Sequence, residues 1–200
     1  METFIYGLLI TTSIVGLTFI IALGRTLRWQ KVLPREIESA VSACQSPGDV
    51  PMLRRACGQH GAPLSRLLLL AADHLEWPKV DNVDAVQTQA RHEIVRLERG
   101  LVVLEIIVGI APLLGLVGTI VGMMAVFGDL GQTGLNDAAK LAQGIALILR
   151  ATLAGLLIAI PALVFWSYYS RKVETLAVEM EALCEEFIRR QYRESALKQP

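Results

Sequence analysis

The stretch Leu101–Phe127, LVVLEIIVGIAPLLGLVGTIVGMMAVF, decides the fold, because it is long, apolar and charged only at Glu105. A helix needs roughly 20 apolar residues to cross a bilayer core about 30 Å thick. Two other stretches meet the same requirement: residues 1–23, whose apolar part carries no charge, and residues 143–169, whose one charge is Arg150. The sequence therefore predicts three transmembrane helices.

The composition of the whole chain is that of a membrane protein. Hydrophobic residues make up 53% and charged residues 19% of the sequence, whereas charged residues usually make up roughly 25% of a soluble protein. The formal net charge is zero, so no excess of basic charge points to nucleic acid as a partner. Three cysteines without a CxxC pair exclude a disulfide framework and a zinc knuckle.

The first apolar stretch could also be a cleaved signal peptide. A signal peptide has a positively charged segment before its apolar core. Here Glu2 precedes the stretch, and Arg25, Arg28 and Lys31 follow it. We therefore expect residues 1–23 to remain as the first transmembrane helix.

The basic residues predict the orientation in the membrane. Of the 19 lysines and arginines, eleven lie in residues 24–100 and six lie in residues 170–200. Segments rich in lysine and arginine stay in the cytoplasm. The rule places these two segments in the cytoplasm, and it places the N-terminus and a short connection at residues 128–142 in the periplasm.

The cytoplasmic segments are predicted to be helical. We expect one helix from Val80 to Phe127, roughly 70 Å long at 1.5 Å per residue, so the second span should project from the membrane. Beyond Ser170, apolar residues recur every three or four positions. This stripe could lie on the membrane surface, but the polar face of the same helix is mostly acidic, unlike that of a surface-bound helix. We expect an all-α membrane protein whose second and third transmembrane helices extend into a cytoplasmic helical bundle.

Small side chains form one strip on each of the last two spans. Such strips let helix backbones approach closely, which favours association in lipid. The strips could pack the three helices of one chain together, or they could also join copies of the chain. Because two long helices leave much apolar surface, we expect a homo-oligomer. The strip residues are Ala111, Gly115, Gly118 and Gly122 on the second span and Ala151, Gly155, Ala159 and Ala162 on the third.

Three polar side chains inside these spans are candidate functional residues. Thr119 and Thr152 lie roughly 7 Å and 5 Å from the midplane towards the periplasm, so their hydroxyls would form a polar ring in an oligomer. A membrane threonine can instead bond only its own helix, to the carbonyl four residues earlier. Arg150 is deep in the membrane and has no obvious partner in this chain, so we interpret it as a contact with a partner protein or with assembly.

No motif for catalysis or metal binding is present. The sequence has no GxxxxGKS/T, HExxH or GxSxG pattern, and its three histidines lack the spacing of metal ligands. We therefore do not expect an enzyme, a metal site or an organic cofactor.

Two runs carry a resemblance to a known family. The run from Ala111 to Met123, APLLGLVGTIVGM, closely resembles the second-helix signature of the MotA/TolQ/ExbB proton-channel family. The resemblance covers essentially the whole chain and is closest to ExbB and TolQ, because flagellar MotA proteins have four membrane helices. Four short runs of this chain resemble the family's third-helix signature: Gly144-Ile145-Ala146, Ala151-Thr152, Gly155-Leu156 and Ala159-Ile160-Pro161-Ala162.

The resemblance implies a pentamer in the bacterial inner membrane around the single transmembrane helices of an ExbD- or TolR-like dimer. An aspartate on the partner takes and releases protons, the coupling ion. The proton-motive force is converted into mechanical work for outer-membrane transport or envelope maintenance. Thr119 and Thr152 match the threonines that line the family's proton path, and membrane lipid surrounds the assembly.

One position departs from the family pattern. Many ExbB and TolQ proteins have a glutamate after the Gly-Ile-Ala run, where this chain has Leu147, three residues before Arg150. The missing acid leaves open a second interpretation, a non-conducting scaffold or sensor on the same fold.

Overall fold

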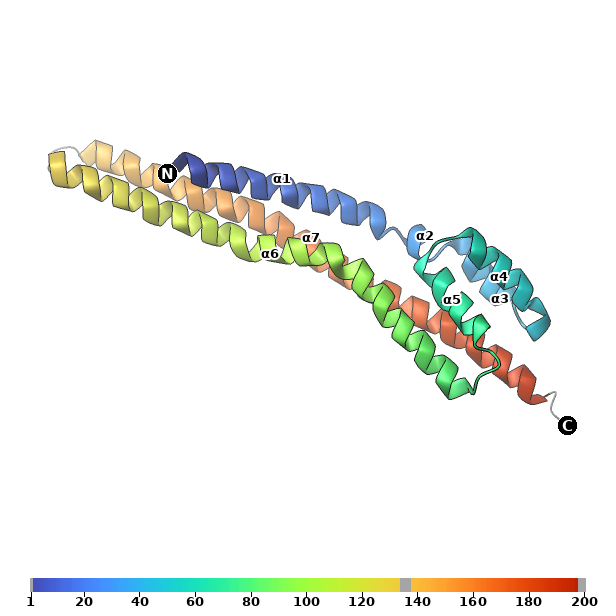
Figure 1. The fold of residues 1–200 in the computed structure, drawn as a ribbon. Helices are drawn as coiled ribbons and strands as arrows, with labels where there is room; N and C mark the ends of the chain where they lie inside the picture. Colours follow the sequence, from blue (N-terminus) through green and yellow to red (C-terminus); the bar gives the residue numbers. More distant parts are fainter. Residues whose placement is uncertain (1, 134–137, 198–200) are drawn as a thin grey trace. The chain divides into compact units, whose positions relative to one another are not determined.

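The computed structural model describes residues 2–133 and 138–197, and the side chains of residues 4–128, 142–146 and 148–193. Every regular element in these residues is helical (Figure 1). The elements are α1 (Glu2–Thr26), α2 (Trp29–Val32), α3 (Arg35–Ala43), the short 3₁₀ helix η1 (Pro47–Asp49), α4 (Val50–Gln59), α5 (Pro63–Asp73), α6 (Lys79–Thr133) and α7 (Ala138–Leu197).

Three of these helices, α1, α6 and α7, are long and apolar enough to cross a membrane. The predicted all-α fold class, with three helices able to span a membrane, is thereby confirmed. α6 has 55 residues and α7 has 60, so each is more than twice as long as a bilayer core is thick. α6 continues to Thr133 and α7 begins at Ala138, so helix covers most of the connection expected at residues 128–142.

The contacts divide the chain into two units. The span unit comprises the residues up to Leu23 together with Gly100–Tyr169. The head unit comprises Gly24–Arg99 together with the residues from Ser170 onward. Both long helices, α6 and α7, contribute to both units.

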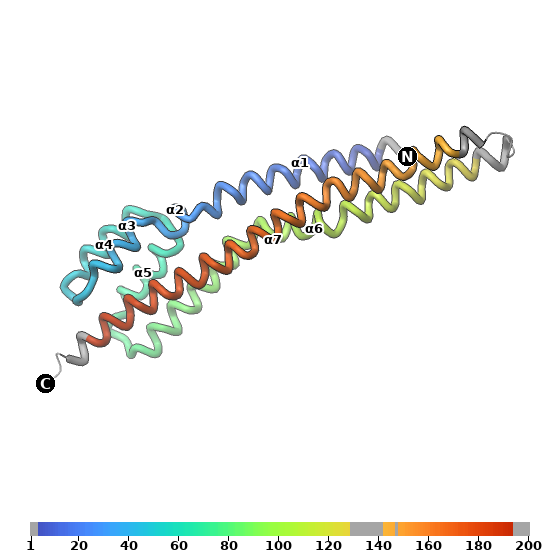
Figure 2. The backbone as a smooth tube through the Cα atoms, turned by 180° about the vertical axis from the view of Figure 1, so that it is seen from behind, coloured from blue at the N-terminus to red at the C-terminus, as the bar shows by residue number. Residues whose placement is uncertain are grey.

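In the span unit, α1 lies alongside the apolar lengths of α6 and α7 (Figures 1 and 2). The Leu23 side chain packs directly on Gly100 of α6. The Tyr169 hydroxyl of α7 donates a hydrogen bond to the Ile20 carbonyl oxygen at 3.0 Å. These contacts hold α1 against both of the longer helices.

The head unit is built around large buried apolar side chains. Proline or aspartate stands at the start of its short helices: Pro34 at the N-cap of α3, Asp49 at that of α4, and Pro63 in the first turn of α5. The apolar stripe beyond Ser170 is buried within this unit and does not form a free amphipathic surface. Its buried members are Val173, Leu176, Met180, Cys184, Phe187 and Ile188.

Candidate functional site

The backbones of α6 and α7 meet directly in the span unit. A Cβ atom at Gly115 would lie 2.9 Å from the Ala151 carbonyl oxygen, and one at Gly155 would lie 2.5 Å from the Ala111 carbonyl oxygen. Both distances are too short for a real Cβ atom, so the contact accommodates only glycine at these two positions. In lipid, such close approach supplies the van der Waals contact that holds helices together.

The other strip residues continue this contact in both directions along the helices. Gly118 faces the Ala151 methyl group, and Gly122 faces the Ile148 side chain. Both predicted strips therefore lie at a contact within one chain, which is the first of the two alternatives that the sequence left open. The contact ends in a buried cluster of Ile107, Ala111, Ala159 and Ala162.

The other side of α6 presents a row of apolar side chains that are between 45% and 70% exposed. They recur every three or four residues, so they form one continuous stripe along the helix. No described residue of the chain covers this stripe, which leaves it to lipid or to other protein. The exposed stripe comprises Val102, Ile106, Ile110, Leu113, Val117, Ile120, Met124 and Phe127.

The Thr152 hydroxyl donates a hydrogen bond across the helix contact, to the Gly115 carbonyl oxygen at 3.3 Å. The acceptor belongs to the neighbouring helix, whereas a lone membrane threonine commonly bonds a carbonyl of its own helix. Because Gly115 has no side chain, the hydroxyl reaches the backbone oxygen.

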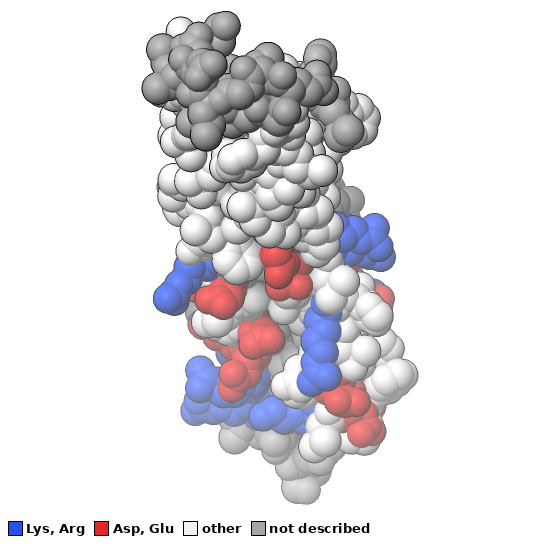
Figure 3. Space-filling model, turned by 90° about the vertical axis from the view of Figure 1, so that its left-hand side faces the viewer, with Lys and Arg blue, Asp and Glu red and all other residues white. Residues whose placement is uncertain are grey.

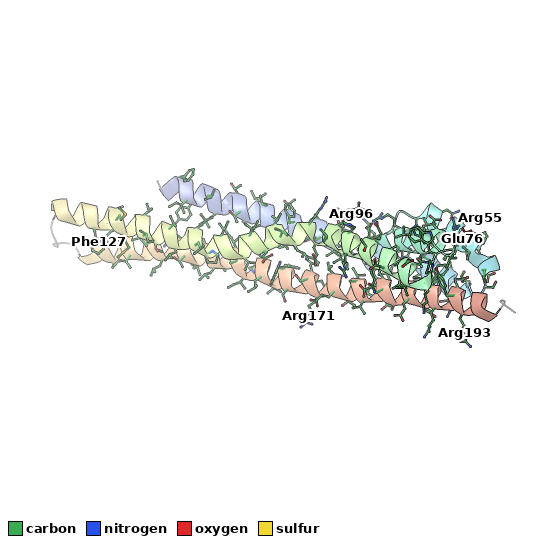
Figure 4. The ribbon with its side chains drawn as sticks, turned by 60° about the horizontal axis from the view of Figure 1, so that its bottom comes forward. Arg55, Glu76, Arg96, Phe127, Arg171 and Arg193 are labelled. Atoms are coloured by element: carbon green, nitrogen blue, oxygen red, sulfur yellow. The ribbon has the colours of Figure 1, made fainter. Side chains whose placement is uncertain are left out.

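The Thr119 hydroxyl instead donates to the Leu116 carbonyl oxygen of its own helix, at 2.7 Å. The residue is half-buried and lines a shallow, open hollow on the surface of α6 whose other lining residues are apolar. A hydroxyl that donates its hydrogen keeps two lone pairs. Thr119 can therefore accept a hydrogen bond from a group in the hollow without breaking its own. The other lining residues are Ile120, Met123, Met124, Gly128 and Phe127, the last of which is labelled in Figure 4.

The Thr152 hydroxyl of α7 bonds the turn of α6 that is next to the turn carrying Thr119. The carbonyl that Thr152 binds is that of Gly115, which lies about 6 Å along the α6 axis from Thr119. One chain therefore brings the two hydroxyls to neighbouring levels without joining them to each other.

Charge is nearly absent from the span unit. On the face drawn in Figure 3, a broad uncoloured band covers the apolar lengths of the helices, and the charged side chains gather elsewhere. Among the span-unit side chains that the structure describes, Glu105 and Arg150 are the charged ones, and both are exposed. Neither forms an ion pair with a described residue. Leu147, the apolar residue in place of the family acid, lies outside the described side chains.

The sequence carries no signal for a buried carboxylate in the head unit. Glu93 on α6 is 1% exposed and accepts hydrogen bonds from Arg66 of α5 at 2.9 Å and from Arg96 at 3.0 Å. The bond from Arg66 lowers the pKa of Glu93, and the same bond raises the pKa of Arg66. Arg66 and Glu93 are 27 residues apart, so no helical periodicity connects them.

Metal ligands do not gather in the part of the chain that the structure describes. No group of three or more His, Cys, Asp or Glu side chains there could hold an ion. The cysteines Cys44, Cys57 and Cys184 are free and buried, and burial raises the pKa of the Cys57 thiol to about 11. A thiol with such a pKa is almost entirely protonated at neutral pH and is a poor nucleophile.

Comparison with known proteins decides the family. Residues 68–182, which include the second span, the third span and the small-residue contact between them, match the MotA/TolQ/ExbB proton channel family. The chain belongs to this family. The resemblance that the two sequence runs carry is therefore confirmed, and the contact of Gly115 and Gly155 lies inside the part that defines a MotA/TolQ/ExbB protein.

Several similar proteins are of the ExbB type. The chain is 36% identical over 97 residues to a biopolymer transport protein ExbB of Helicobacter pylori. The aligned residues make up 48% of this chain and 62% of the relative. It is 30% identical over 144 residues to an ExbB homologue of Methanothermobacter thermautotrophicus, and the aligned residues make up 72% of this chain and 51% of that relative. It is 32% identical over 160 residues to an ExbB-like protein of Synechocystis, and the aligned residues make up 78% of this chain and 62% of that relative. The chain thus spans between 51% and 62% of the length of these relatives.

Proposed function

We propose that this chain is the ring-forming subunit of a proton-driven motor of the ExbB or TolQ type. With a single-span partner of the ExbD or TolR type, it converts the proton-motive force into mechanical work for outer-membrane transport or envelope maintenance. Membership of the proton channel family supports the proposal. The observation that carries it is the pair of hydroxyls, Thr119 on α6 and Thr152 bonded to the adjacent turn of α6, in two helix spans made almost entirely of apolar residues.

The proposed assembly is a homo-pentamer in the bacterial inner membrane, with a dimer of the partner in its central pore. The N-terminus faces the periplasm, and the head unit and the C-terminal end of α7 face the cytoplasm. The exposed stripe on α6 supports an assembly, because three of its members, Ile120, Met124 and Phe127, line the same hollow as Thr119. A polar group that faces lipid finds no hydrogen-bond partner there, whereas a partner protein can supply one. Lipid covers the rest of the spans.

In the proposed path, Thr119 serves a carboxyl group that the partner supplies. A protonated carboxyl group can donate to the Thr119 oxygen, which keeps its lone pairs while it bonds Leu116. Once the proton has left, the carboxylate needs a donor, and the Thr119 hydroxyl can rotate away from the Leu116 carbonyl to become one. Thr119 therefore serves both states of the acid without changing its own protonation.

A second candidate function is a non-conducting scaffold or sensor. The observation that favours it is Leu147, an apolar residue where many family members carry an acid. Arg150, three residues later, is exposed, and a fixed positive charge near a pore raises the electrostatic barrier to protons. On this interpretation the chain assembles with its partner and carries no proton flux.

Proton flux in vesicles that contain this chain and its partner tests the proposal. Thr119→Val and Thr152→Val keep the shape of the side chain and remove its hydroxyl. The loss of one interaction of roughly 1–2 kcal/mol should slow flux about five- to thirty-fold. In the proposed path Thr152 serves the same partner carboxylate as Thr119, so the double variant should depart from additivity.

Arg150→Leu is the control for this experiment. It should reduce assembly or partner docking more than it reduces flux per assembled complex. Wild-type flux from fully assembled Thr→Val variants would contradict the proton path. A wild-type complex that assembles and carries no flux supports the scaffold.

A further inference from the structure

In the head unit, the exposed side of α6 carries a row of charged residues around one exposed apolar side chain. Val95 is 57% exposed, and Arg91 and Arg99 lie four residues before and after it, so all three share one face. Asp84 lies on the same face, seven residues before Arg91. We refer to these four residues as the α6 outer face. None of them forms an ion pair with a described residue.

The exposed side of α7 in the head unit carries a similar row with the opposite charges. Val178 is 65% exposed and is flanked by exposed acidic residues at spacings of three and four. These side chains also form no ion pair with a described residue. The α7 outer face comprises Glu174, Val178, Glu181, Glu185 and Arg189.

Contacts within the chain show which residues of the two antiparallel helices lie at one level. The Asn82 amide of α6 donates to the Tyr192 hydroxyl of α7 at 3.2 Å. A cavity of about 430 Å³ lies between the same two helices and is lined by α6 residues from Lys79 to Ala90 and by α7 residues from Glu181 to Ile188. A step forward along α6 therefore matches a step backward along α7, to within about one helical turn.

This relation brings the two outer faces into register. Arg99 lies within about a turn of the level of Glu174, Val95 of that of Val178, and Arg91 of that of Glu181. At the end of the row, Asp84 lies within about a turn of the level of Arg189. Charge opposes charge and the apolar residue meets the apolar residue at every one of these levels, although no ion pair joins the two faces within one chain.

We propose that the α6 outer face of one copy docks on the α7 outer face of the next copy. The inference rests on the proposed ring, in which every copy stands at the same height, so that residues at one level on neighbouring copies meet. The contact joins two different faces, as a closed ring requires. Individual surface ion pairs contribute little, but a row of complementary charges fixes the register and excludes wrong pairings.

Charge reversal on one face at a time tests the proposal. The double variant Arg91→Glu, Arg99→Glu places like charges opposite Glu174 and Glu181, and it should lower the assembled fraction about tenfold at low salt. The double variant Glu174→Arg, Glu181→Arg should do the same. Combining all four changes makes the faces complementary again and should restore assembly. The measurement is the mass of the complexes that the full chain forms when it is extracted in mild detergent.

The control is the double variant Arg35→Glu, Arg55→Glu, which changes the net charge by the same amount on two exposed arginines of α3 and α4; Arg55 is labelled in Figure 4. It should assemble like the wild type. Wild-type assembly of both outer-face variants overturns the docking of these faces and leaves the ring itself standing. A wild-type chain that is monomeric overturns the ring and, with it, this contact.

Cross-linking decides the matter if a charge-reversed variant does not fold. Val95→Cys on one tagged copy and Val178→Cys on a second copy should form a disulfide between copies under mild oxidation. Val95→Cys alone should form none, because the ring places Val95 against Val178 and not against itself. A Val95–Val95 disulfide, or no disulfide in the mixture, overturns the proposal.

Discussion

The span unit and the head unit pack the same two helices in opposite ways. In the span unit, α6 meets α7 through Gly115 and Gly155, with backbone against backbone. In the head unit, the core is filled by large side chains, of which Leu176 and Phe187 are completely buried. The head unit also buries the carboxylate of Glu93 between two arginines, whereas the described span-unit charges are exposed.

The difference follows from the surroundings that each unit is built for. Lipid chains are as apolar as leucine, so large side chains between helices gain little there and close backbone approach does more. A surface rich in charge is built for water, where burying apolar area contributes roughly 25 cal/mol per Å². The same helices therefore carry glycine and alanine at one contact and leucine and phenylalanine at the other.

Gly155→Leu should have the largest effect, because it removes the span-unit packing outright. A Cβ atom at Gly155 already lies 2.5 Å from the Ala111 carbonyl oxygen, so a leucine forces the two backbones apart. We expect loss of folded protein, measured as the yield of monodisperse protein in mild detergent. Gly109→Leu is the matched control, since nothing lies within 4 Å of a Cβ atom there. Equal loss in both variants would show that the helix contact is not responsible.

Phe187→Ala should have the next largest effect, because it opens a cavity in the head unit. The side chain is completely buried, and deleting a buried phenylalanine costs about 3–5 kcal/mol. The expected result is a clear drop in the Tm followed by circular dichroism. Phe127→Ala serves for comparison: this phenylalanine of the span unit is 60% exposed, and its removal should change the Tm little. A larger drop for Phe127 would reverse the proposed contrast.

Glu93→Gln should destabilise the head unit by about 2 kcal/mol at neutral pH, because the hydrogen bonds from Arg66 and Arg96 lose their charged acceptor. The effect should depend on pH. Glu93 has a pKa below its usual value of 4.5, so the stability that it contributes is complete above about pH 4.5 and is lost as the pH falls below that value. The difference in Tm between the wild type and the variant should therefore shrink in acid. A difference that stays constant with pH would contradict the ion pair.

The smallest effect should distinguish the two threonines by stability. Thr152→Val removes a hydrogen bond between helices, worth about 0.6 kcal/mol in a membrane protein. Thr119→Val removes a bond within one helix, so it should cost less. Unfolding by a denaturing detergent, with the helical signal as the readout, measures both. Equal stability of the two variants would mean that the bond from Thr152 to Gly115 does not hold the helices together.

The fold could be predicted because it depends on properties that neighbouring residues share. The apolar length around Leu114 and the spacing of Gly115, Gly118 and Gly122 are visible in the sequence itself. They determine which segments are long helices and where those helices can approach.

The polar contacts could not be predicted in the same way, because each depends on residues that only the fold brings together. Thr152 and Gly115 are 37 residues apart, and Tyr169 and Ile20 are 149 apart. The sequence identified Thr152 by its depth, but it could not say which helix supplies the acceptor. The role of Arg150 depends on surfaces that belong to other chains.

The contact between the backbones of α6 and α7 also removes a degree of freedom. A helix with a uniform apolar surface can turn about its own axis in lipid, but the glycines of α6 that pack on α7, Gly115, Gly118 and Gly122, lie on one side of the helix. A turn by one residue, about 100°, would bring Leu116 in place of Gly115 against the backbone of α7. The rotation of α6 about its own axis is therefore fixed, and the direction in which Thr119 points is fixed with it. Any change in what Thr119 meets has to come from movement of a neighbouring chain past it, because α6 cannot rotate to present another residue.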